Sequence, residues 1–152
     1  MRFQLRRATR HDIDQIEPMV AAYHDFEQIG STREQRLGAL QTLLADRNLG
    51  GLWMVELDDQ LAGYIALCRG FSIEFNGFDA FVDEFFLQPE FRGRGLGKRV
   101  LAAIQAEARQ AGIQALHLEV AQDNSAAQGL YRQAGFVTRD KYRLMSLDLT
   151  RD

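Results

Sequence analysis

One stretch of the chain, from Asp83 to Gly97, constrains the fold more than any other. An apolar run over residues 80–87 predicts a strand, and Pro89 ends it because proline has no backbone N–H to donate. A glycine-rich turn follows, and from Leu96 onward apolar residues recur at helical spacing. The first N–H groups of a helix lack partners within the helix and lie at the positive end of its dipole. A strand, a glycine-rich turn and a helix start in succession therefore predict an anion-binding site.

The spacing of the three glycines at positions 93, 95 and 97 excludes two common phosphate motifs. A P-loop continues Gly-Lys-Ser/Thr, whereas here Gly97-Lys98 is followed by Arg99, so no hydroxyl is available for Mg²⁺. The dinucleotide fingerprint Gly-x-Gly-x-x-Gly does not match either. If it began at Gly93, its last position would be Lys98, and if it began at Gly95, its last position would be Val100. Another kind of phosphate ligand is therefore expected.

Two motifs fit such a ligand. The first, Arg92-x-x-Gly95-x-Gly97, resembles the acyl-CoA-binding signature of the GNAT family of N-acetyltransferases. The second places Asn124, Ala127 and Tyr131 at i, i+3 and i+7, on one face of a helix, and resembles the second signature of the same family. The two motifs occur in the family's order, and the resemblance extends over residues 52–149.

The N-terminal part of the chain predicts a short opening strand and two helices. Thr9 or Asp12 can cap the first helix, and Pro18 should kink it or shorten its first part. The second helix is expected to begin at Ser31 or Thr32.

A hairpin and a loop are expected next. Residues 24–27 lie at the end of the first helix and are expected to be partly exposed to solvent. Two apolar runs, 52–57 and 61–68, flank three polar residues and predict an antiparallel hairpin, the second strand being covered on both faces. Residues 69–77 are expected to form an exposed loop before the central strand.

The C-terminal half predicts a parallel strand pair and then an antiparallel one. The helix 96–110 connects the central strand to a strand at 115–120, which gives a βαβ unit with a right-handed crossover. A helix over residues 124–134 follows, and residues 137–139 and 144–149 are expected to close the sheet as an antiparallel pair.

With 152 residues, the chain is expected to form a single domain, 1–152. It is predicted to be an α/β fold of the GNAT type, with a mixed central sheet of about six to seven strands. The resemblance implies that the sheet is splayed at its two parallel central strands and carries helices on both faces. It further implies acetyl-CoA as cosubstrate, bound in the gap of the splay.

The resemblance assigns roles residue by residue. Backbone N–H groups of the glycine-rich loop would bind the pyrophosphate, the main chain of the central strand would pair with the pantetheine arm, and Asn124 would hydrogen-bond that arm. Tyr131 would protonate the leaving sulfur as the general acid. The cofactor-binding residues are predicted to be Phe85, Phe86, Leu87, Arg92, Gly93, Arg94, Gly95, Leu96, Gly97, Lys98, Asn124 and Ala127.

The chemistry also requires a base. An alkyl amine with a pKa of about 10.4 is almost fully protonated at neutral pH and must lose a proton before it attacks. Glu84 or Asp83 is the expected base; because neighbouring residues of a regular strand point to opposite faces, only one of them should face the acceptor. Four carboxylates around the central strand favour a cationic acceptor such as a small amine, polyamine or amino acid: Glu74, Asp79, Asp83 and Glu84.

Two alternative functions remain at this point. A protein acetyltransferase acting on lysine or an N-terminal amine would share the same motifs, and a non-catalytic acyl-CoA sensor would share the loop.

A net charge of −3 without a basic stripe argues against nucleic acid as a partner. No metal site is expected, because no second His or Cys stands near His117, and Cys68 is expected to be a small buried residue. No apolar run has transmembrane length, so a cytoplasmic protein without a membrane partner is expected, and family members often form homodimers.

Overall fold

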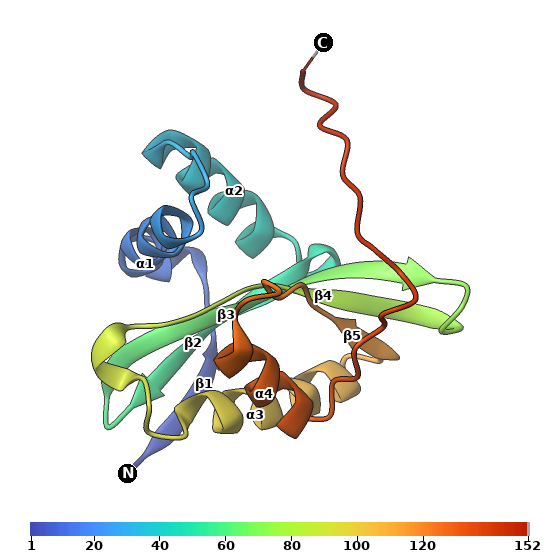
Figure 1. The fold of residues 1–152 in the computed structure, drawn as a ribbon. Coiled ribbons are helices and arrows are strands. Elements are labelled where there is room, and N and C mark those ends of the chain that lie inside the picture. Colours follow the sequence, from blue (N-terminus) through green and yellow to red (C-terminus); the bar gives the residue numbers. More distant parts are fainter. Residues whose placement is uncertain (152) are drawn as a thin grey trace.

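The computed structural model describes residues 1–151, which form one five-stranded sheet covered by helices on both faces (Figure 1). The strands lie in chain order: β1 (Phe3–Arg7), β2 (Gly50–Leu57), β3 (Gln60–Ser72), β4 (Gly77–Leu87) and β5 (Ala115–His117). The helices are α1 (Ile13–Phe26), α2 (Arg33–Ala45), α3 (Leu96–Gln110) and α4 (Ser125–Gln133). The mixed α/β architecture with helices on both faces agrees with the predicted fold.

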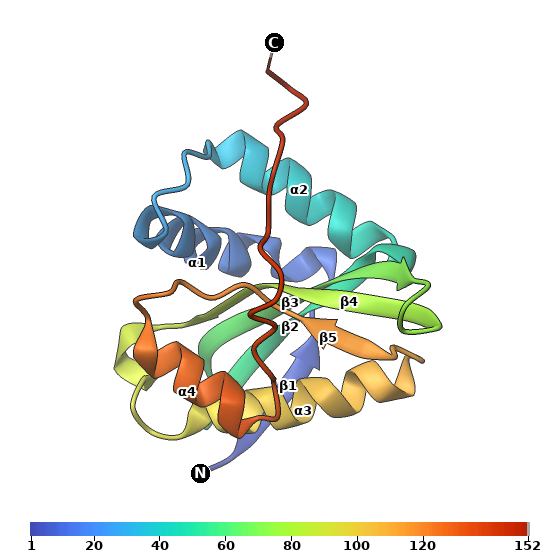
Figure 2. The ribbon, with the colours of Figure 1, turned by 45° about the vertical axis from the view of Figure 1, so that its right-hand side comes forward.

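Each face of the sheet carries its own apolar core. Helices α1 and α2 pack on one face, and α3 and α4 lie on the other, as both views show (Figures 1 and 2). The α1 side buries Ile16, Met54 and Tyr64 completely. The α3 side buries Ile65 and Ile104 completely. Strand β3 therefore alternates between two cores, which explains why its sequence is almost continuously apolar.

The sheet is antiparallel from β1 to β4 and parallel only at its last pair. Strands β4 and β5 pair only over Asp79–Phe81 and Ala115–His117, although β4 continues to Leu87. The part of β4 beyond Phe81 therefore has no strand partner on its β5 side. This is the splay between two parallel strands that the family resemblance implies.

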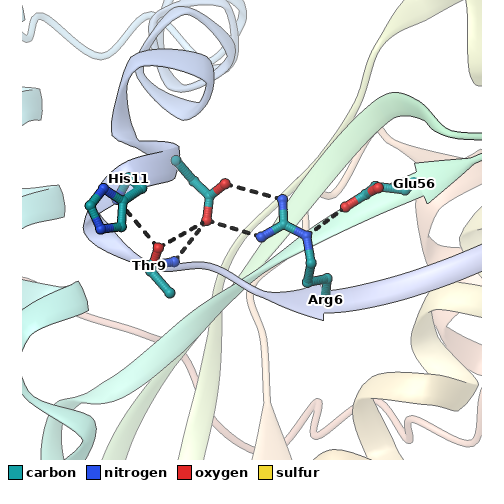
Figure 3. Close-up of polar contacts among 5 residues, drawn as sticks. Arg6, Thr9, His11 and Glu56 are labelled. Atoms are coloured by element: carbon teal, nitrogen blue, oxygen red, sulfur yellow. Dashed lines mark hydrogen bonds and ion pairs between the residues drawn. The ribbon is translucent and has the colours of Figure 1, made fainter.

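Polar contacts attach the start of α1 to the sheet. Arg6 on β1 donates to Glu56 on β2 and to Asp12, and Asp12 in turn accepts from the backbone N–H of Thr9 (Figure 3). Thr9 caps the 3₁₀ turn from which α1 continues at Ile13, whereas Asp12, the N-cap residue of α1, makes no side-chain capping bond to that helix. The helix runs through Pro18 without shortening, and Thr32 caps α2 as predicted.

Three expectations about the sheet are wrong. Residues 69–77 are not a loop, because β3 continues to Ser72 and pairs with β4 from Gly77 onward. The strand expected at 115–120 ends at His117. Residues 137–139 and 144–149 form no strand pair within the described chain, so the sheet has five strands rather than six or seven. The C-terminal segment instead runs away from the domain (Figures 1 and 2).

Candidate active site

Strand β4 contains a bulge at the two candidate base residues. Ala66 of β3 lies opposite Glu84, but the next residue, Leu67, lies opposite Val82, so Asp83 is an extra residue. The cores show the effect: Val82 belongs to the α3-side core, whereas Phe86 belongs to the α1-side core. A regular strand would place residues 82 and 86 on the same face. The alternation therefore changes phase at the bulge, and the regular alternation from which only one of Asp83 and Glu84 was expected to face the acceptor does not hold here.

Glu84 is held by two partners on the α1 side. The Tyr64 hydroxyl donates to Oε1 of Glu84 over 2.9 Å, and Nε2 of His24 lies 2.6 Å from Oε2. The side chains of His24 and Glu84 are only 15% and 19% exposed. Burial, reinforced by the charge of Glu84, raises the pKa of Tyr64 far above its ordinary value, so this phenol remains a donor. Glu84 is thus a carboxylate with a fixed orientation.

His24 is itself fixed by a second set of contacts. Its Nδ1 lies 2.7 Å from the Ser31 hydroxyl, and the Arg36 guanidinium donates to both the hydroxyl and the carbonyl of Ser31. Arg36 also pairs with the buried carboxylate of Glu17 over 2.9 Å. A continuous chain of polar contacts therefore runs from α2 and α1 to the carboxylate on β4.

Asp83 has a different environment. It is exposed, and no ion pair involves it among residues 1–151. Burial, with the neighbouring carboxylate of Asp83 adding to it, raises the pKa of the half-buried Cys68 thiol to about 11. The other two acidic residues of the predicted cluster have cationic or imidazole partners, Glu74 with Arg139 and Asp79 with His117. Asp83 is therefore the carboxylate of this cluster that has no ion-pair partner in the described chain.

The glycine-rich turn leads directly from β4 into α3. Gly93 and Gly95 have φ values of 75° and 77°, a region that favours glycine, and Gly95 is the N-cap of α3 without a side-chain capping bond. The first N–H groups of α3 therefore remain available to an anion. The predicted loop residues Arg92, Arg94 and Lys98 are exposed around them and add positive charge.

The other residues of this motif are used for packing. Leu96 is buried in the α3-side core, and a Cβ on Gly97 would lie 3.0 Å from Cδ2 of Leu130 on α4. Gly97 thus allows α3 and α4 to approach closely. The predicted strand residues Phe85, Phe86 and Leu87 pair with β3 but have no strand partner on the β5 side. Nε of Arg92 donates to the carbonyl of Leu87 over 2.8 Å.

Helix α4 brings the second motif to the open side of the splay. Asn124 is its N-cap, and its side-chain oxygen accepts from the backbone N–H of Ala127 over 3.1 Å. The carboxamide N–H₂ makes no bond among the described residues and remains available. Burial, and secondarily the charge of Glu27, raise the pKa of Tyr131. Its phenol therefore keeps its proton at neutral pH.

Tyr23 connects the two halves of the site. Its ring packs edge-on against Phe86, with the ring centres 6.5 Å apart. Burial raises the pKa of Tyr23 to about 12, with contributions from nearby Glu84 and Tyr131. Tyr23 of α1 therefore lies within electrostatic range of both the predicted acid on α4 and the predicted base on β4.

Sequence reasoning missed the contributions of α1. His24 was expected to lie at a solvated helix end, yet it contacts Glu84, a residue 60 positions away. One local signal was present: His24 follows the buried Val20 by four residues and so shares its helix face.

The chain belongs to the acetyltransferase (GNAT) family, whose model matches residues 15–136. It is 27% identical over 130 residues to an uncharacterized N-acetyltransferase of Archaeoglobus fulgidus, covering 84% of this chain and 88% of that protein. Other curated relatives are matched over a smaller share of their own length, 53% for one and 62% for another.

Solved structures share the fold over nearly the whole chain. An integron cassette protein from a salt-marsh metagenome has a TM-score of 0.86 and 28% identity, with 98% of this chain and 92% of that chain covered. An aminoglycoside N-acetyltransferase in complex with CoA has a TM-score of 0.80 and 16% identity, with 97% and 94% covered. At 16% identity the second likeness shows the fold alone.

Over residues 1–151, no three His, Cys, Asp or Glu side chains gather in an arrangement that could hold a metal ion. No helix in the same range has the length and apolar character needed to cross a membrane.

Proposed function

We propose that this protein is an acetyl-CoA-dependent N-acetyltransferase whose acceptor is a small cationic amine. The observation that carries the proposal is the arrangement at the end of β4: an oriented carboxylate, an unpaired strand edge and an uncapped helix start within one segment, residues 83–97. Membership of the family supports the reaction type.

The residues present fit acetyl-CoA, which would supply the acetyl group as a thioester. The uncapped start of α3 with its exposed Arg92, Arg94 and Lys98 suits a pyrophosphate. The unpaired edge of β4 beyond Phe81 offers backbone groups to the amide-containing arm, as an added strand would use them. The carboxamide N–H groups of Asn124, which have no partner in the described chain, would donate to the same arm.

Glu84 would act as the general base. Its two donors, Tyr64 and His24, fix the orientation of the carboxylate while leaving lone pairs for a proton from the acceptor, directly or through one water. The amine nitrogen then forms a bond to the acetyl carbon as the bond from that carbon to sulfur breaks. The amine's proton goes to Glu84.

Tyr131 would supply the proton that the departing sulfur requires. Because burial raises its pKa, the phenol is fully protonated before reaction and can donate. Proton balance is then complete within one complex of enzyme and both substrates, since Glu84 gains the proton that the amine loses and Tyr131 gives one to the thiolate. No covalent link to the protein is needed.

Asp83 would select a cationic acceptor. It lies on the same face as Glu84 because of the bulge, and it is the acidic residue of the cluster with no ion-pair partner in the described chain. An exposed carboxylate there attracts an ammonium group before Glu84 removes its proton. A curated relative named an aminoglycoside N(6′)-acetyltransferase, 29% identical over 92 residues, supports a small amine acceptor.

The test is thiol release from acetyl-CoA in the presence of a panel of amines, carboxylic acids and a lysine peptide. The proposal predicts release with small cationic amines and little with acids. Release only with the peptide would favour a protein acetyltransferase, and acetyl-CoA binding without release from any acceptor would favour a sensor.

A further inference from the structure

Helices α1 and α2 and the loop between them carry three polar residues that reach Glu84 only through His24: Glu17, Ser31 and Arg36. Nδ1 of His24 faces Ser31, and Nε2 faces the carboxylate. The side chains of Arg36 and Glu17 are only 13% and 10% exposed, so their bonds are shielded from water. In such a place a donor that faces a donor, or an acceptor that faces an acceptor, costs free energy. The direction of each bond in this chain therefore follows from the groups at its two ends.

Arg36 defines the direction at the first end. A guanidinium can only donate, and Arg36 donates to the Glu17 carboxylate over 2.9 Å and to the Ser31 hydroxyl oxygen over 3.1 Å. It also donates to the carbonyl of Ser31 over 2.7 Å, which holds the serine backbone in place. The Ser31 oxygen thus accepts from Arg36, and its one O–H proton is free to be donated to Nδ1 of His24, 2.7 Å away.

Glu84 defines the direction at the other end. An ionised carboxylate can only accept, so Nε2 of His24, 2.6 Å from Oε2, must carry a proton. A neutral imidazole with its proton on Nδ1 would instead place two unshared electron pairs against each other at this distance. Of the two neutral tautomers, only the one protonated on Nε2 satisfies both ends of the chain.

A doubly protonated His24 fits the same contacts less well. Its Nδ1–H would point at the Ser31 oxygen, and the hydroxyl proton of Ser31 would lose its acceptor. The added positive charge would also lie on the side of the imidazole where Arg36 already binds Ser31, and like charges repel. The bond to Glu84 is made in either form, since Nε2 carries a proton in both. The contacts at Nδ1 therefore favour the neutral imidazole.

We propose that Ser31, held by Arg36, is a positioning residue that keeps His24 in the neutral tautomer protonated on Nε2. Every bond from Arg36 to Glu84 then donates toward the carboxylate. The proposal rests on the proposed function in one respect, the assignment of Glu84 as the base. His24 is not a base itself, because its Nε2 already carries a proton and its Nδ1 accepts from Ser31. Its N–H stabilises the ionised form of Glu84, which is the form that can take a proton from an amine.

The test is the protonation state of His24, read from long-range ¹H–¹⁵N NMR spectra of the ¹⁵N-labelled protein without substrates. The spectra are recorded at about pH 8, above the ordinary histidine pKa of about 6.5. The two ring nitrogens have different shifts in each neutral tautomer and similar shifts in the imidazolium. His24→Gln identifies the signals, because the chain has only two other histidines, His11 and His117.

We expect the unaltered protein to show the neutral tautomer protonated on Nε2. Ser31→Ala should give a mixture of both neutral tautomers, and Ser31→Thr, which keeps the hydroxyl, should restore the single form. An imidazolium or a proton on Nδ1 alone in the unaltered protein would overturn the proposal. An unaltered His24 spectrum in Ser31→Ala would overturn it too.

Turnover gives a second readout. Ser31→Ala should lower kcat roughly two- to tenfold, the rate equivalent of one hydrogen bond, with the KM for acetyl-CoA unchanged. Ser31→Thr should recover most of the loss, and a kcat of Ser31→Ala equal to that of the unaltered protein would remove Ser31 as a positioning residue. The NMR spectrum does not require turnover. A protein that shows the expected tautomer but acetylates no acceptor would therefore contradict the proposed function and not the state of His24.

Discussion

Nε2 of His24 on α1 lies 2.6 Å from the carboxylate of Glu84 on β4, and the Tyr64 hydroxyl holds the other carboxylate oxygen. The contact joins a helix of the N-terminal layer to the bulged strand beside the splay. It gives the two otherwise equivalent acidic residues of the bulge different roles: Glu84 is oriented, whereas Asp83 is exposed. The first two predictions follow from this difference.

Replacing Glu84 by Gln should lower turnover roughly a hundredfold or more, the usual contribution of a general base, while acetyl-CoA binding is retained. The amide keeps the shape of the side chain but cannot take a proton. Steady-state kinetics together with calorimetric binding of CoA would measure both. Asp83→Asn is the matched control, and it should raise KM for a cationic amine with a smaller change in kcat. The assignment of the base is wrong if the effects of the two variants are reversed.

Replacing His24 by Ala should lower kcat roughly tenfold, because Glu84 loses one of its two orienting donors. This loss is smaller than that of Glu84→Gln, since the base itself is still present. His24→Gln, which keeps an N–H donor, should recover part of the loss. The pH profile of kcat should also shift in the Ala variant, an effect that a purely structural role would not produce. Unaltered kinetics in His24→Ala would remove it as a positioning residue.

Replacing Tyr131 by Phe should lower turnover tenfold or more if the phenol protonates the leaving sulfur. Because burial raises the pKa of Tyr131, the phenol is protonated below that pKa and loses its proton only as pH rises through it. The alkaline decline of kcat caused by this group should therefore lie above the ordinary tyrosine value of about 10. A decline below that pH that disappears in Tyr131→Phe would contradict the direction of the shift.

Replacing Asp12 by Asn should lower the free energy of unfolding by about 1–3 kcal/mol, since the side chain would lose its charge-assisted bonds to Arg6. The Arg6 guanidinium, with the backbone bond from Thr9, lowers the pKa of Asp12 below its ordinary value of 3.8. A depressed pKa contributes stability that is present above the unfolded-state pKa and is lost as pH falls through the folded-state pKa. Denaturant unfolding should show the full difference at pH 7 and a smaller one near pH 3. An equal difference at both would contradict this account.

Local patterns predicted the helices and the glycine-rich turn well. Helix α3 begins and ends where its apolar spacing and the turn indicate, at Leu96 and Gln110, and Thr32 caps α2 through a bond to the residue three positions on. These features depend on neighbours within about one helical turn. The sequence alone contains all the information they need.

The features that sequence reasoning missed depend on distant contacts. The bulge at Asp83 is defined by its pairing with β3, and the contact between His24 and Glu84 exists only once α1 packs on the sheet. Residues 144–149 have the alternation of a strand, but a strand also requires an edge to pair with, and the C-terminal segment runs away from the domain instead of pairing with β5. Alternation predicts the capacity to pair and not the partner.

The most direct test of the central claim is the release of CoA thiol from acetyl-CoA by the unaltered protein, with and without a small cationic amine. We expect release that depends on the amine, saturates with it and yields the acetylated amine in equal molar amount, as established by mass spectrometry. Absence of both CoA binding and thiol release would contradict the proposed acetyl-CoA dependence.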